Sequence, residues 1–191
     1  TLQGTSANTV EALAAAVEAG GYDGLFLDVP KLKYENQKAL TALVQGLDAA
    51  LGEKILYVAA EAPVWEGRTY EGYDYAALGR LADRLVLRVA PYEQSTGRFP
   101  VAPVEPQEEV YYALAELKGT VPGEKISLLL TTTGAVWTDG RRNGTMNGTE
   151  LAARLADRNT ESDYSGRYAC AYLAYAEQSK KQTVVWYLND T

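Results

Sequence analysis

Apolar residues follow two different patterns at the start of the chain. In Val10–Ala19 they recur at the spacing of one helical face, and Gly20-Gly21 ends the pattern. Leu25–Val29 is instead a short, continuous apolar run that follows Gly24 and stops before Pro30. The first pattern predicts an amphipathic helix, and the second predicts a strand buried on both faces.

The same pair of patterns then recurs along the chain. Helices are predicted over Asn36–Leu51, Tyr75–Ala82 and Glu108–Leu117, and each precedes a predicted strand, over Ile55–Ala60, Leu85–Ala90 and Ile126–Thr131. Such alternation predicts an α/β fold with a parallel sheet and covering helices, as a barrel or as an open doubly wound sheet. No glycine-rich nucleotide-binding motif follows any of the strands, which favours the barrel.

The pattern changes after Thr131. Gly134–Thr149 is rich in Gly, Asn and Thr and predicts a long loop, and Glu150–Ala156 predicts a short helix. Arg167–Ala176 fits both a helix and a strand, whereas Thr183–Leu188 is rich in β-forming residues. Periodicity alone leaves a helix or a hairpin arm open for the first of these two segments.

Length and charge narrow the classes of function. The 191 residues, 47% of them hydrophobic, predict one domain, although a complete eight-unit barrel usually needs about 250 residues. A net charge of −7 repels phosphates and anionic lipids, so we expect no nucleic-acid partner. No apolar run reaches the roughly 20 residues that span a bilayer, and no signal peptide is recognisable, so we expect no membrane insertion.

The content of histidine and cysteine limits the chemistry further. The chain has no His, which excludes Ser-His-Asp and Cys-His nucleophile systems and His-ligated zinc. Cys170 is the only cysteine, which excludes an intrachain disulfide and a multi-cysteine metal site. We therefore expect no metal and no cofactor, and acid–base chemistry would depend on carboxylates, Tyr or Lys.

Three segments resemble family 18 glycoside hydrolases. Gly21–Pro30, which reads G-Y-D-G-L-F-L-D-V-P, is similar to the signature of the fourth barrel strand. Tyr73–Gly79, which reads Y-D-Y-A-A-L-G, resembles the segment before the sixth strand of bacterial members. Gln182–Tyr187 is similar to a strand of the hairpin inserted after the seventh strand in spore-wall and peptidoglycan-related members.

The resemblance implies a fold, a domain boundary and a location. The four predicted strands would be the fourth to seventh of a TIM barrel, so residues 1–191 would be a single domain that is a partial or truncated barrel. A β-hairpin insertion would occupy about residues 167–189. The resemblance also implies an extracellular or cell-surface protein that contacts glycans containing N-acetylglucosamine.

The resemblance also implies that part of the chemistry of the family is lost. In the family a glutamate protonates the glycosidic oxygen, the acetamide of the substrate attacks the sugar carbon, and an aspartate orients that acetamide. Asp28 matches the orienting aspartate, but Pro30 replaces the acid and Phe26 replaces an inner polar residue. Because loss of a positioned acid typically costs about 10²–10⁴ in rate, we do not expect ordinary turnover, and Asp28 would need new hydrogen-bond donors.

Other residues are candidates for an altered site. Glu61 ends the second strand and Glu35 follows Pro30 by five residues, so either carboxylate could serve as a relocated acid. Trp65, Tyr92 and Trp137 follow predicted strands and could stack on sugar rings. The competing interpretations are ordinary ones: Asp28 as a strand-end cap, the glutamates as solvated charges and the aromatic rings as packing.

Three hypotheses follow. The first is a degenerate module that binds cell-wall or chitin-like glycan without hydrolysing it, the second an active hydrolase with a relocated acid, and the third a purely structural domain of a surface protein. Because the four predicted strands leave two sheet edges, at Leu25–Val29 and Ile126–Thr131, we also expect homodimerisation through these edges or their protection.

Overall fold

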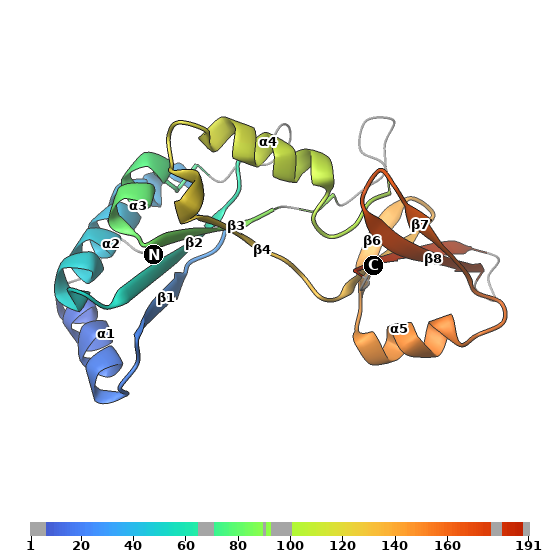
Figure 1. The fold of residues 1–191 in the computed structure, drawn as a ribbon, viewed down its shortest axis with the longest axis horizontal. Coiled ribbons are helices and arrows are strands. Elements are labelled where there is room, and N and C mark those ends of the chain that lie inside the picture. Colours follow the sequence, from blue (N-terminus) through green and yellow to red (C-terminus); the bar gives the residue numbers. More distant parts are fainter. Residues whose placement is uncertain (1–6, 65–70, 90, 93–100, 177–180, 189–191) are drawn as a thin grey trace. The chain divides into compact units, whose positions relative to one another are not determined.

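The computed structural model describes residues 7–64, 71–89, 91–92, 101–176 and 181–188 (Figure 1). The chain divides into two compact units. Unit 1 consists of Thr1–Val89 and Tyr111–Leu129, and unit 2 consists of Ala90–Val110 and Leu130–Thr191. That these units form a single domain stays a prediction, because two compact units can belong to one domain.

Unit 1 alternates helices and strands as the hydrophobic pattern predicts. Helix α1 (Ala7–Ala19) precedes β1 (Gly24–Asp28), α2 (Gln37–Leu51) precedes β2 (Ile55–Glu61), and α3 (Tyr75–Leu81) precedes β3 (Arg84–Arg88). Helix α4 (Gln107–Leu117), which begins in unit 2, leads to β4 (Ile126–Leu129). Two single turns of 3₁₀ helix, η1 (Tyr34–Asn36) and η2 (Gly123–Lys125), precede α2 and β4.

The four strands of unit 1 form one parallel sheet in the order β1-β2-β3-β4. Helices α1, α2 and α3 lie on one side of it (Figure 1). Leu56, Val58, Leu85 and Leu87 alternate along the two central strands and are almost completely buried. Because side chains alternate between the faces of a strand, Asp28, Glu61 and Arg88 all belong to the other face.

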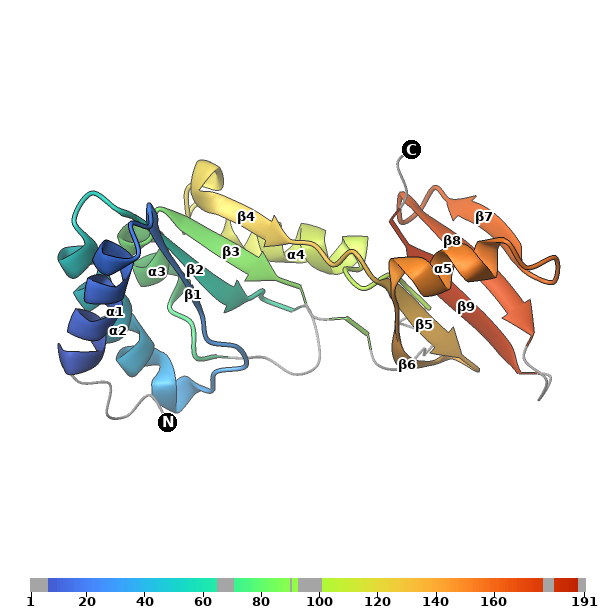
Figure 2. The same cartoon turned by 90° about the horizontal axis from the view of Figure 1, so that it is seen from below.

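Unit 2 is built on an antiparallel sheet of five strands, in the order β6-β5-β9-β8-β7 (Figure 2). Its helix, α5 (Gly148–Leu155), starts with a capping box in which Asn147 and Glu150 satisfy each other's backbone N–H groups. The strands are β5 (Gly134–Thr138), β6 (Arg141–Met146), β7 (Glu161–Ser165), β8 (Cys170–Ala176) and β9 (Gln182–Tyr187).

Each face of the sheet of unit 2 has its own apolar cluster. On one face Leu173, Tyr175 and Val185 pack with Leu151 of α5. The cluster on the other face is mainly aromatic; it contains Ala102, Ala135, Trp137, Tyr168, Cys170 and Trp186. The hairpin predicted near the C-terminus is confirmed, because β8 and β9 pair in antiparallel register.

The prediction of a long loop over Gly134–Thr149 is wrong. The segment contains the β5–β6 hairpin, which turns at Asp139-Gly140 with positive φ at both residues (49° and 75°). Such a turn matches the twist of the flanking strands, and Asp-Gly is one of its preferred sequences. The many Gly, Asn and Thr residues belong to an exposed strand, β6, and to the cap of α5.

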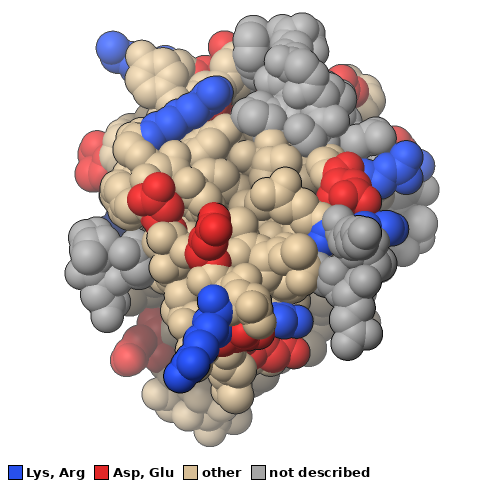
Figure 3. Space-filling view, turned by 90° about the vertical axis from the view of Figure 1, so that its right-hand side faces the viewer, with Lys and Arg blue, Asp and Glu red and all other residues tan. Residues whose placement is uncertain are grey.

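Three features are relevant to the kind of partner: the charge of the surface, the character of the helices and the grouping of possible metal ligands. On the face in Figure 3, acidic and basic side chains are interspersed around a mainly uncharged centre. None of the helices in the described part of the chain has the length and apolar character needed to cross a membrane. No group of three or more metal-ligating side chains occurs among the described residues.

Candidate functional site

An ion-pair network joins three strands at the carboxyl end of the parallel sheet. Arg88 Nη2 of β3 lies 2.7 Å from Asp28 Oδ2 of β1, and Arg88 Nη1 lies 3.2 Å from Glu61 Oε1 of β2. The side chain of Glu61 is only 5% exposed, that of Arg88 is 27% exposed, and that of Asp28 is 40% exposed. One guanidinium therefore serves two carboxylates, one buried and one accessible.

The register of the sheet explains how this network forms. Glu61 pairs with Arg88 across β2 and β3, whereas Asp28 pairs with Ala59 across β1 and β2. Neighbouring strands are about 4.8 Å apart, so Arg88 must reach across β2 to contact Asp28. The small side chain of Ala59 leaves room for this reach, and the long arginine side chain can span it.

The electrostatics favour the fully charged network. Partial burial opposes the charge of Arg88, but the hydrogen bonds and charges of Asp28 and Glu61 outweigh it and raise the pKa of Arg88 above its usual value. A guanidinium stays protonated in proteins, and its hydrogen bonds to carboxylates are charge-assisted. Asp28 thus accepts a charge-assisted hydrogen bond from Arg88.

The turn after β1 contains Pro30 and is fixed by hydrogen bonds with Tyr73 and Gly72. Tyr73 is 3% exposed; its hydroxyl donates to Val29 O at 2.8 Å and accepts from Leu32 N at 3.4 Å. Gly72 N donates to Leu32 O at 3.1 Å. Lys31 has a φ of 58°, a left-handed conformation that is strained for a residue with a side chain. The exposed Pro30 thus lies in a fixed turn.

Two further residues of the Tyr73–Gly79 segment support the site. Tyr75 donates to Glu61 O at 2.7 Å, and burial is the main cause that raises the pKa of this tyrosine. Asp74 caps α3, because its side chain accepts from Ala77 N at 2.9 Å. The tyrosines therefore fix the backbone at the ends of β1 and β2, and the aspartate caps the start of α3, which leads from β2 to β3.

Phe26 lies on the same face of β1 as Asp28, two residues earlier. Its ring is 49% exposed, so it does not fill the centre of the sheet as an inner aromatic residue would. An accessible ring next to an accessible carboxylate forms a partly apolar, partly polar surface at the β1 edge. Sequence reasoning treated Phe26 only as the loss of a polar group.

The other predicted site residues are distributed as follows. Glu35 is exposed in η1, and Trp65 lies outside the described residues. Tyr92 belongs to unit 2, where its hydroxyl donates to the buried Glu109 at 3.1 Å, and burial is the main cause that raises its pKa. Trp137 is 1% exposed, and its indole N–H donates to Ala102 O at 2.7 Å. A ring packed in this way has no face free for a sugar.

Sequence reasoning missed three residues of the site, namely Tyr73, Tyr75 and Arg88. The tyrosines lie in the Tyr73–Gly79 segment, whose family resemblance drew attention to it. The resemblance did not indicate what the two side chains do. Arg88 gave a weaker signal, because a charged residue directly after the apolar run Leu85–Leu87 is common at a strand end. Its partners become apparent only from the order of the strands.

Comparisons with known proteins identify the fold. No protein-family model matches the sequence, and no curated protein matches it either. Among solved structures, a Bacillus subtilis protein named as a sporulation-specific glycosylase superimposes with a TM-score of 0.81 at 20% identity, over 96% of this chain and 63% of that one.

Two other solved structures lead to the same assignment. A chitinase of Chromobacterium violaceum has a TM-score of 0.78 at 20% identity, over 94% of this chain and 58% of its own. The spore cortex-lytic enzyme SleL of Bacillus megaterium has a TM-score of 0.75 at 21% identity, over 94% of this chain and 43% of its own. The chain has the fold of family 18-like glycosidases and spans less than two thirds of the length of these structures.

Proposed function

We propose that the chain is a chitinase-like module that binds glycan containing N-acetylglucosamine and does not hydrolyse it. One observation carries the proposal: Asp28, the aspartate retained from the catalytic signature, forms an ion pair with Arg88 beside a position where Pro30 stands in place of the acid. The site thus keeps polar groups that can bind and has lost the group that donates a proton.

The candidates for a relocated acid are poorly suited to that role. A general acid must reach the leaving oxygen of the sugar and deliver a proton. Glu61 is 4% exposed and accepts a hydrogen bond from Arg88, so it is enclosed and serves as a counter-ion. Glu35 is exposed in η1, and none of the contacts described places it beside Asp28.

Binding is supported by the surface around Asp28. Sugars are typically bound by an aromatic ring that stacks on the apolar face of the pyranose and by charged or amide groups that form hydrogen bonds with its hydroxyls. Phe26 offers the ring, and Asp28 and Arg88 offer an acceptor and donors within the same part of the sheet. We place the glycan along the edge of β1, with Phe26 as its stacking platform.

The structures that share the fold support our proposal for the class of ligand. They include proteins named as chitinases and as spore cortex-lytic enzymes, so we propose a chitin-like or cell-wall glycan and an extracellular or cell-surface location. We also propose that the sheet corresponds to strands four to seven of a TIM barrel and that the antiparallel sheet of unit 2 is inserted after the seventh.

Binding and turnover can be measured on the same purified protein. We expect the chain to sediment with insoluble chitin or peptidoglycan and to release no fluorophore from a fluorogenic N-acetylglucosamine oligomer. Phe26→Ala and Asp28→Asn should each weaken binding by at least about tenfold, equal to about 1.4 kcal/mol. The matched control is Tyr164→Ala, which removes an aromatic ring of similar exposure (46%) from the sheet of unit 2.

The other two hypotheses predict different results. An active hydrolase would release fluorophore and lose this activity in Glu61→Gln or Glu35→Gln. A purely structural domain would stay in the supernatant when the insoluble glycan is sedimented, with the wild type and the two site variants indistinguishable. Either result would overturn the proposal.

A further inference from the structure

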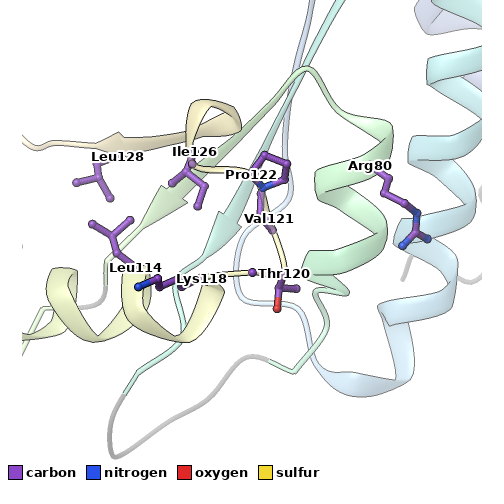
Figure 4. Close-up of a pocket in the computed structure, with 10 residues that line it drawn as sticks. Arg80, Leu114, Lys118, Thr120, Val121, Pro122, Ile126 and Leu128 are labelled. Atoms are coloured by element: carbon purple, nitrogen blue, oxygen red, sulfur yellow. The ribbon is translucent and has the colours of Figure 1, made fainter.

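A groove lies in unit 1 beside β4 and is also lined by residues of α3 and α4 (Figure 4). Its volume is about 790 Å³. In Figure 4, Leu114 of α4 and Leu128 of β4 approach each other across it. Its described lining is mainly apolar and carries no carboxylate, but it includes two cations, Arg80 and Lys118. In a chain of net charge −7, this is a locally basic and apolar surface.

The helix that lines the groove is apolar on two faces. Its inner face carries Ala113 and Leu117, which are 0% and 2% exposed. Its outer face carries Tyr111, Leu114 and Ala115, and Lys118 follows directly after the helix ends at Leu117. This is the i, i+3, i+4, i+7 spacing by which a helix packs against another element. We call these four outer residues the α4 stripe.

Tyr111 is the most conspicuous member of the α4 stripe. It is 77% exposed, the largest value for any large hydrophobic side chain among the described residues. It lies one helical turn before Leu114, which lines the groove and is 39% exposed. A protruding ring and an apolar groove thus lie next to each other on one helix.

We propose that the α4 stripe and its groove bind a second copy of this chain, with the two α4 helices antiparallel. A two-fold axis between Leu114 and Ala115 places Tyr111 of each copy opposite Lys118 of the other. It also places Leu114 of each copy opposite Ala115 of the other. A two-fold interface requires such self-complementarity, because each contact occurs twice.

Charge and shape both favour this occupant. The face of a tyrosine ring attracts cations, and the groove that receives Tyr111 is lined by Arg80 and Lys118. Ala115 is small enough to let the axes of the two helices approach to about 8–10 Å, the usual distance between packed helices. The interface lies within unit 1 and uses none of the residues proposed to bind glycan.

Sedimentation equilibrium over a range of concentrations tests the proposal. We expect a reversible dimer, whose dissociation constant rises by at least about tenfold in Tyr111→Ala and in Leu114→Lys. The matched control, Tyr34→Ala, removes another highly exposed tyrosine (66%) from η1 and should leave the dimer unchanged. Circular dichroism should give the wild-type spectrum for all three variants, because the side chains are exposed.

Cross-linking provides a second readout that does not depend on affinity. Ala115→Cys should be joined to a second copy by a short bismaleimide, whereas a cysteine at Tyr34 should not. A wild-type chain that remains monomeric at high concentration would overturn the proposal. So would a dimer that Tyr111→Ala and Leu114→Lys leave intact, because it would then form elsewhere, for example through the edges of β1 and β4.

Discussion

Arg88 Nη2 lies 2.7 Å from Asp28 Oδ2 and so joins two strands that are not neighbours in the sheet. The contact gives Asp28 a structural role, since Asp28 shares the guanidinium with the buried Glu61. A carboxylate engaged in this way can still accept from a ligand, because it is partly exposed. In the proposed function, Asp28 and Arg88 therefore contribute to both stability and binding.

Replacing Arg88 with Met should destabilise the fold strongly. The change leaves Glu61, which is 4% exposed, without its counter-ion, and breaking a buried pair typically costs about 3–5 kcal/mol. We expect about 3 kcal/mol, because Arg88 and Asp28 are partly exposed to water. Urea unfolding followed by circular dichroism measures the change in the free energy of unfolding.

Two variants separate the lost ion pair from the lost side-chain volume. Arg84→Met removes an arginine from the same strand whose described hydrogen bond is to Ser127 at 3.3 Å, and it should cost about 1 kcal/mol or less. Adding Glu61→Gln to Arg88→Met should recover part of the loss, because it removes the uncompensated charge. Equal losses for Arg84→Met and Arg88→Met would contradict this account of the network.

Gly72→Ala should loosen the turn that carries Pro30. A Cβ at Gly72 would lie 2.4 Å from the Cβ of Leu32 and 2.7 Å from its carbonyl carbon, so one of the two backbones must move. We expect a loss of about 1–3 kcal/mol, the usual cost of overpacking. Thermal unfolding should show a lower Tm for this variant and an almost unchanged Tm for Gly123→Ala, where a Cβ would meet nothing within 4 Å.

Much of unit 1 could be predicted from the sequence, because each of its elements leaves a local signature. The apolar stripe of Asn36–Leu51 matches α2, and the run Leu25–Val29 matches β1 within one residue. Strand β7 (Glu161–Ser165) left no such signature, because all of its residues except Ser165 are exposed and an edge strand needs no apolar face.

The candidate site was less predictable because it depends on pairing between distant residues. Asp28, Pro30 and Glu61 could be identified from their position at strand ends. The role of Arg88 required the strand register, and the burial of Trp137 required the packing of segment 101–104 against β5. A tryptophan after a predicted strand looks the same in a sequence whether its ring is buried or free.

The pH dependence of stability should reveal the ionisation of the Glu105 carboxyl. Burial raises the pKa of this carboxyl above its ordinary value of 4.5, and the hydrogen bond from Thr131 N at 3.0 Å offsets this only in part. A carboxyl whose pKa is raised by folding favours the folded state below its unfolded pKa. That contribution is lost as the pH rises through the raised value.

Glu105→Gln should therefore raise the Tm at neutral pH, because it keeps an acceptor for Thr131 N and removes the partly buried charge. The difference from the wild type should shrink as the pH falls below about 4.5, where Glu105 is protonated. Differential scanning calorimetry across this range checks the sign. A variant that is less stable at neutral pH would show that the charge of Glu105 is needed.

Cys170 should resist alkylation in the folded protein. It is 2% exposed, its Sγ donates to Tyr187 O at 2.9 Å, and burial raises the pKa of its thiol. Because the thiolate is the reactive form, both the access of the reagent and the ionisation of the sulfur are suppressed. Iodoacetamide at mildly alkaline pH should label the native chain far more slowly than the chain in urea, as measured by mass spectrometry. Rapid labelling of the native chain would mean that β8 and β9 separate often. Trp186→Ala removes a packing partner from the same cluster. The labelling rate of this variant should therefore rise towards that of the unfolded chain.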